Sequence, residues 1–113
     1  MDDSGVPQVE VSAVPSQPGP EFTLLDVRED DEWQLGHAPG AQHIPMGDIP
    51  VRMAELDTDR ELFVICHFGG RSQRVAMYLQ RNGYDAINVR GGMAAWSATG
   101  RPVITDDGDP GAV

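Results

Sequence analysis

Lysine is missing from this sequence, and all eight of its basic residues are arginines. Enzymes that use a lysine as a Schiff-base nucleophile or as a general base are therefore excluded. The 18 acidic residues bring the formal net charge to −10. Such an acidic chain is poorly suited to bind the phosphate backbone of nucleic acids, so we expect no nucleic-acid partner.

Long apolar runs are also missing. No stretch approaches the roughly 20 apolar residues that span a bilayer. The first ten residues, MDDSGVPQVE, are acidic where a signal peptide would be basic and then apolar. We expect a cytoplasmic protein without a membrane partner.

Cysteine occurs once, at Cys66. A single cysteine excludes an internal disulfide and a C-x-x-C redox cycle, and it suits a reducing compartment. An oxidised or sulfur-loaded Cys66 would have no resolving thiol in its own chain. Any turnover at this residue therefore needs an external acceptor.

The residues around Cys66 predict a strand, a loop and a helix. Residues 62–65 form a short apolar run that is typical of a buried strand. Apolar residues from 72 to 81 recur at the spacing of one helix face. Between them, Gly69 and Gly70 can adopt backbone angles that turn N–H groups toward the sulfur, forming an anion-binding nest.

This arrangement favours a reactive, negatively charged sulfur at Cys66. The N-terminus of the following helix points its positive end into the loop, and Arg71 adds a permanent charge. His67 has a possible electrostatic role and no assigned proton transfer. The alternative interpretation is that Cys66 is a small buried apolar side chain at a strand end.

The loop Cys66-His67-Phe68-Gly69-Gly70-Arg71-Ser72 fits the pattern C-x-x-G-x-R-S and resembles the rhodanese family of sulfurtransferases. Two further segments carry the same resemblance, LLDVREDDEWQLGHAPGAQHIP and the closing GGMAAW. Together they cover most of the chain between Leu24 and Trp96.

The resemblance implies that Cys66 takes up a sulfane sulfur as a persulfide and passes it to an acceptor. It implies a small anionic sulfur donor, a thiol, cyanide or protein acceptor, and neither a cofactor nor a metal. The implied donor-binding residues are Arg71, His67, Phe68, Gly69, Gly70 and Ser72. The implied structural residues are Asp26, Arg28 and His37, with Asp26 and Arg28 placed to form an ion pair or to bind loop backbone.

Three other kinds of protein could carry a reactive cysteine in such a loop. A phosphatase or arsenate reductase of similar architecture has one more residue between its cysteine and arginine, which makes a wider cradle than this loop can form. A Cys-His protease would need an aligned histidine and a larger body. A non-catalytic or sulfur-relay module that docks to a partner protein stays open. For the donor, the resemblance implies thiosulfate rather than mercaptopyruvate, because mercaptopyruvate-using relatives lack the arginine of the Arg71-Ser72 ending.

The whole chain predicts one α/β domain with three layers: a parallel sheet of about four to five short strands and helices on both faces. We expect strands at 9–11, 23–27, 62–65 and 86–89, and helices at 30–35, 47–56 and 72–81. The first of these helices could be capped by Asp30 or Asp31. Gly91 and Gly92 should let the backbone pass close to the Cys66 loop. Residues 1–8 and 105–113 are expected to be poorly ordered tails around a domain at 9–104.

Overall fold

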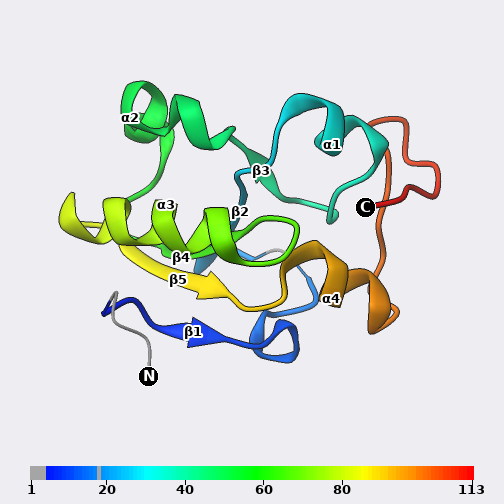
Figure 1. Ribbon diagram of the computed structural model, residues 1–113, viewed down its shortest axis with the longest axis horizontal. Helices are drawn as coiled ribbons and strands as arrows, with labels where there is room; N and C mark the ends of the chain where they lie inside the picture. Colours follow the sequence, from blue (N-terminus) through cyan, green and yellow to red (C-terminus); the bar gives the residue numbers. More distant parts are fainter. Residues whose placement is uncertain (1–4, 18) are drawn as a thin grey trace.

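The computed structural model describes residues 5–17 and 19–113. Its centre is a five-stranded sheet in the order β1-β5-β4-β2-β3, and every neighbouring pair is parallel. The strands are β1 (Gln8–Val9), β2 (Phe22–Asp26), β3 (Gln42–His43), β4 (Glu61–Ile65) and β5 (Asp85–Val89). The parallel α/β sheet predicted from the sequence is therefore confirmed (Figure 1).

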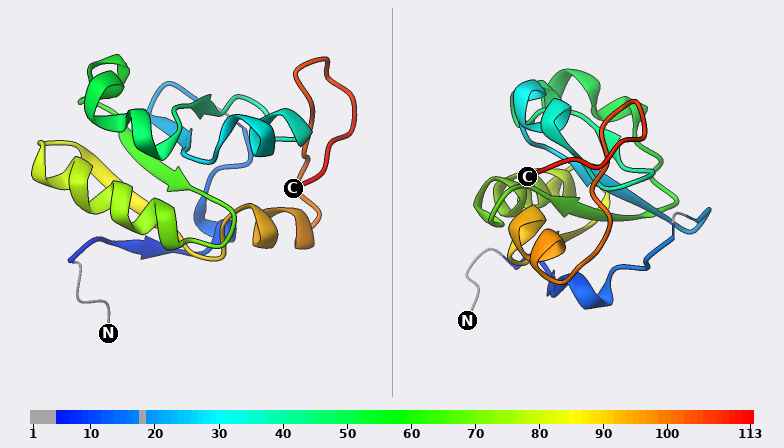
Figure 2. Two further views of the ribbon diagram at one scale, coloured as in Figure 1. Left: turned by 45° about the horizontal axis from the view of Figure 1, so that its top comes forward. Right: turned by 90° about the vertical axis from the view of Figure 1, so that its right-hand side faces the viewer.

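Helices cover both faces of this sheet (Figures 1 and 2). The α-helices are α1 (Asp30–Leu35), α2 (Ile49–Arg52), α3 (Gly70–Arg81) and α4 (Gly92–Ala98). One apolar cluster packs residues of α2 and α3 against the sheet, and a second packs α4 and the 3-10 turn Val11–Ala13 against the opposite face. Because alternate strand residues face opposite sides, β2 and β4 contribute to both clusters.

The segment between β3 and β4 differs from the single helix expected at 47–56. It consists of three short turns, Met46–Asp48, α2 and Met53–Glu55. Pro50 lies in the first turn of α2, where a missing N–H is tolerated. The α1 cap also differs, since Glu29 is the N-cap and forms a reciprocal capping box with Glu32.

Parts of both segments that were predicted to be tails contact the domain. Residues 1–4 lie outside the described residues, but Val6 is buried and Gln8 pairs with β5. At the other end, the Ala112 N–H donates to the Leu35 carbonyl at 2.9 Å. Gly36 permits this approach, because a Cβ there would lie 2.6 Å from the Ala112 oxygen. Backbone pairing therefore links the end of 105–113 to the end of α1, and the poor order expected from the composition of this segment stays a prediction.

Within the described ranges, no helix is long and apolar enough to cross a bilayer.

Candidate functional site

Cys66 lies directly after β4, at the carboxyl edge of the sheet, and only 1% of its surface is exposed. The N–H of Gly69 donates to the Cys66 sulfur over 3.0 Å. Gly69 can do so because it is in the left-handed region, with φ of 110°, and it is the N-cap of α3. Gly70 is already helical, so the turned backbone expected at both glycines is present at the first alone.

The N-terminus of α3 provides further donors beside the sulfur. The first N–H groups of an α-helix have no acceptor within the helix, and here they belong to Gly70, Arg71 and Ser72. Together with the Gly69 N–H they favour negative charge at this end of the helix. The loop can therefore stabilise a charged sulfur or a small anion through backbone groups alone.

The first turn of α4 forms backbone hydrogen bonds with the Cys66 loop. The Met93 N–H donates to the Cys66 carbonyl at 2.7 Å, and the Ala94 N–H donates to the His67 carbonyl at 3.0 Å. Gly92 has φ of 57°, and a Cβ on it would overlap both loop carbonyls. The close backbone approach predicted for the Gly91-Gly92 pair is confirmed.

Ser72 and Asn88 form a buried polar pair beside the sulfur. The Ser72 hydroxyl lies 3.3 Å from the Cys66 sulfur and 2.5 Å from Asn88 Oδ1. Sequence reasoning included Ser72 but missed Asn88. A usable signal was present, since Asn88 is a polar residue in the apolar run of β5, where it is only 2% exposed.

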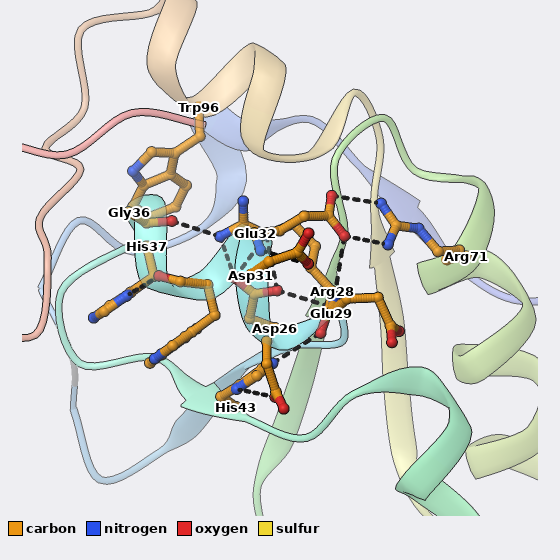
Figure 3. A network of polar contacts seen from close by, with 12 residues as sticks. Asp26, Arg28, Glu29, Asp31, Glu32, Gly36, His37, His43, Arg71 and Trp96 are labelled. Atoms are coloured by element: carbon orange, nitrogen blue, oxygen red, sulfur yellow. Dashed lines mark hydrogen bonds and ion pairs between the residues drawn. The ribbon is translucent and has the colours of Figure 1, made fainter.

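Arg71 is held by a partner that the sequence did not reveal. Its guanidinium donates to both carboxylate oxygens of Glu32 on α1, at 2.6 and 3.0 Å (Figure 3). This hydrogen-bonded contact lowers the pKa of Glu32 from 4.5 to about 2 and raises the pKa of Arg71. Glu32 therefore balances part of the permanent positive charge that Arg71 brings to the loop.

Asp26 and Arg28 form the buried ion pair that their spacing indicated. Both side chains are fully buried, with the Arg28 Nη2 2.9 Å from Asp26 Oδ2 and 2.7 Å from the Gly36 carbonyl oxygen (Figure 3). Their contacts connect the end of β2 to the end of α1. These contacts fit the structural role that was predicted for the pair.

His37 also bonds to backbone, which fits the structural role that the resemblance implies. Its Nδ1 lies 2.9 Å from the Trp33 carbonyl oxygen. The Trp33 ring is sandwiched between two imidazoles, with centroid distances of 3.6 Å to His37 and 4.6 Å to His43. His43 Nε2 in turn donates to the Arg28 carbonyl at 2.8 Å. This stack braces α1, the helix that carries Glu32.

His67 and Phe68 form the outer part of the loop. Phe68 is 73% exposed, and its ring meets the His67 ring edge to face at 4.3 Å. A large exposed aromatic next to a buried cysteine is placed to contact an incoming molecule. Contact between these two side chains and a sulfur donor stays a prediction.

Comparison with known proteins identifies the family. A model of the rhodanese-like domain matches residues 11–99. The chain is 49% identical over 82 residues to "Putative sulfurtransferase YtwF" of Bacillus subtilis (strain 168), covering 73% of this chain and 80% of that protein. It is 36% identical over 97 residues to "Putative sulfur carrier protein YrkF" of the same organism, covering 83% of this chain and 52% of that protein.

A solved structure agrees with this match. The crystal structure of a rhodanese-like domain protein from Staphylococcus aureus has a TM-score of 0.72 and 34% identity, over 80% of this chain and 91% of that one. The chain belongs to the rhodanese-like domain family. The resemblance carried by the Cys66 loop is thereby confirmed.

Proposed function

We propose that this protein is a sulfurtransferase whose Cys66 accepts a sulfane sulfur from thiosulfate or a similar small anionic donor. The observation that carries the proposal is the placement of the Cys66 sulfur, 3.0 Å from the Gly69 nitrogen and beside the first turn of α3. This placement favours negative charge both on the sulfur and on a ligand next to it. The names of the relatives support the same reaction class.

The transfer balances without an added oxidant or reductant. The Cys66 thiolate attacks the outer sulfur of thiosulfate, the S–S bond of the donor breaks, and sulfite leaves with the bonding electron pair. Cys66 then carries a persulfide. An acceptor such as cyanide or a thiolate attacks the outer sulfur, the persulfide bond breaks, and the Cys66 thiolate is restored.

The protein's own groups assist each of these steps. Backbone N–H groups of the loop and of α3 stabilise the charge on Cys66 before attack and on the terminal sulfur afterwards. Because Cys66 is only 1% exposed, bulk water is kept from the persulfide. Arg71 can offer the donor those N–H groups that Glu32 leaves free.

Intact-mass measurement with and without thiosulfate tests the first half of the reaction. The wild-type chain should gain the mass of one sulfur atom, and Cys66→Ser should gain none, because a hydroxyl is a poor nucleophile at neutral pH. A wild-type protein that takes up no sulfur, or a Cys66→Ser variant that keeps thiosulfate:cyanide transfer, contradicts the mechanism.

A sulfur-relay or docking module is the second candidate, and one relative bears the name of a sulfur carrier. A relay accepts one sulfur from the donor but passes it to cyanide slowly. Steady-state turnover of thiosulfate with cyanide therefore separates the two functions. Rapid turnover supports the enzyme, and sulfur loading without turnover supports the relay.

A further inference from the structure

Asn88 is a buried amide whose hydrogen-bonding atoms all have partners. Its Nδ2 donates to the Gln8 Oε1 at 2.8 Å and to the Gly69 carbonyl at 3.2 Å. Its Oδ1 accepts from the Ser72 hydroxyl at 2.5 Å. Burying an amide in a sheet is costly unless such bonds compensate for lost hydration. Three bonds that converge beside the Cys66 loop indicate a role in that loop.

The amide can have only one orientation in this environment. The Gly69 carbonyl is an obligatory acceptor, so the nitrogen of Asn88 must face it and the oxygen must face Ser72. The Ser72 hydroxyl has one proton but two neighbouring acceptors, Asn88 Oδ1 and the Cys66 sulfur. When the proton points to Asn88, the lone pairs of the Ser72 oxygen face the sulfur.

The protonation state of the sulfur decides whether the Ser72 hydroxyl donates more favourably to Asn88 or to the sulfur. A neutral Cys66 thiol can donate to the Ser72 oxygen while Ser72 donates to Asn88, and this forms a continuous chain. A Cys66 thiolate can only accept, so Ser72 must turn its proton away from Asn88 to stabilise it. Asn88 therefore competes with the charged sulfur for a single proton.

Asn88 also acts on the loop backbone. The Gly69 carbonyl accepts from both Asn88 Nδ2 and the Gln73 N–H, at 3.2 Å each. In a trans peptide the carbonyl and the following N–H point in opposite directions. Fixing the Gly69 carbonyl toward β5 and α3 therefore turns the Gly70 N–H the other way, out of the N-terminus of α3.

We propose that Asn88 is a positioning residue for Cys66 that acts through the direction of the Ser72 proton. The inference rests on the proposed sulfur chemistry at Cys66. Asn88 keeps the Ser72 hydroxyl ordered while the sulfur is neutral, and yields the proton when the sulfur is charged. Without the Asn88 side chain, the Ser72 hydroxyl donates its proton to the Cys66 sulfur.

A double-mutant cycle isolates this effect from any loosening of the loop. Alkylation of Cys66 by iodoacetamide is followed from pH 6 to 9 in the wild type, Asn88→Leu, Ser72→Ala and the double variant. The loop effect of Asn88→Leu is common to both Ser72 backgrounds and cancels. At pH 7, the ratio of the alkylation rate of the Asn88→Leu variant to that of its parent should be about threefold to tenfold larger with Ser72 present than with alanine at position 72.

Three outcomes are distinguished. The positioning role is supported by a coupling of that size, provided that Asn88→Leu displaces the alkylation profile to lower pH only when Ser72 is present. Additive effects, or a coupling of opposite sign, overturn it. Asn88→Val, which suits a strand, replaces the leucine if that variant fails to fold.

Two controls complete the design. Asn82→Leu removes an exposed asparagine, at the end of α3, and should leave the alkylation profile unchanged. Sulfur loading by thiosulfate is measured separately on the wild type. If the wild type loads sulfur but the cycle is additive, the positioning role of Asn88 fails and the sulfurtransferase proposal stands. If the coupling is found but the wild type loads no sulfur, the effect of Asn88 on Cys66 stands and the sulfurtransferase proposal fails.

Discussion

Replacing Glu32 with glutamine removes the charge that occupies Arg71 while keeping the side chain's length and one acceptor oxygen. In the wild type, two hydrogen bonds of 2.6 and 3.0 Å join α1 to the start of α3 across 39 residues of sequence. The neutral amide can still accept one bond from the guanidinium. The loss is therefore mainly the charge-assisted part of the interaction.

The expected loss of stability follows from the pKa of Glu32. Its fall from 4.5 to about 2 would correspond to an upper limit of about 3 kcal/mol in the free energy of unfolding. The Arg71 and Glu32 side chains are 32% and 29% exposed, and solvent screening reduces this to about 1 to 2 kcal/mol. Urea unfolding at pH 7 should therefore show Glu32→Gln to be less stable by that amount.

The pH dependence gives a sharper check. The pKa of Glu32 in the folded state lies below its unfolded value, so its contribution is fully present above pH 4.5 and is lost as the pH falls toward about 2. The stability gap between wild type and Glu32→Gln should shrink over that interval and close at its acidic end.

Glu55→Gln is the matched control for this experiment. Glu55 makes a similar bidentate contact with Arg52, but the side chains are 49% and 38% exposed. Its removal should cost less than the removal of Glu32. If the two variants lose equal stability, or if the Glu32→Gln gap stays constant as the solution is acidified, the contact between α1 and α3 does not stabilise the fold as reasoned.

Three further predictions concern the loop and its supports. Arg71→Ala should raise the KM for thiosulfate about tenfold to a hundredfold with a smaller change in kcat, and an unchanged KM removes Arg71 from the donor site. Gly92→Ala should be far more destabilising in thermal melts than Gly83→Ala, because both have positive φ but only Gly92 would place a Cβ against loop carbonyls; equal losses would refute the close approach. Asp26→Asn should cost about 3 to 5 kcal/mol in urea unfolding by leaving Arg28 buried without a counter-charge, and a loss below about 1 kcal/mol would show that the charge is compensated elsewhere.

The features that could be predicted from the sequence are the local ones. A buried strand, a glycine turn and an amphipathic helix each leave a pattern within about a dozen residues, so β4, the Cys66 loop and α3 were found close to their true bounds. Asp26 and Arg28 are two positions apart on one strand end, so their pairing was also within reach. The Gly92 contact was inferred because parallel strands end at a common edge.

The features that were missed depend on segments that meet only in three dimensions. Nothing near Glu32 distinguishes it from the acidic neighbours with which it begins α1, and its partner lies 39 residues away. The two-residue strand β3 is too short to leave a periodic pattern. Pairing of 105–113 depends on a close approach to Gly36, which composition does not reveal.

The Glu32 contact bears on how the proposed site would bind an anionic donor. Because Glu32 balances part of the Arg71 charge, much of the positive potential at the site comes from backbone dipoles, which are the Gly69 N–H and the first turn of α3. Dipoles act over a shorter range than net charges and depend on contact geometry. In a body of net charge −10, distant attraction of an anion is weak, so we expect the proposed donor to be selected by its fit within the loop. This geometry is set by Gly92, which packs against the loop carbonyls, and by Asn88, which bonds to Gly69. We therefore expect these two residues to matter as much as Arg71.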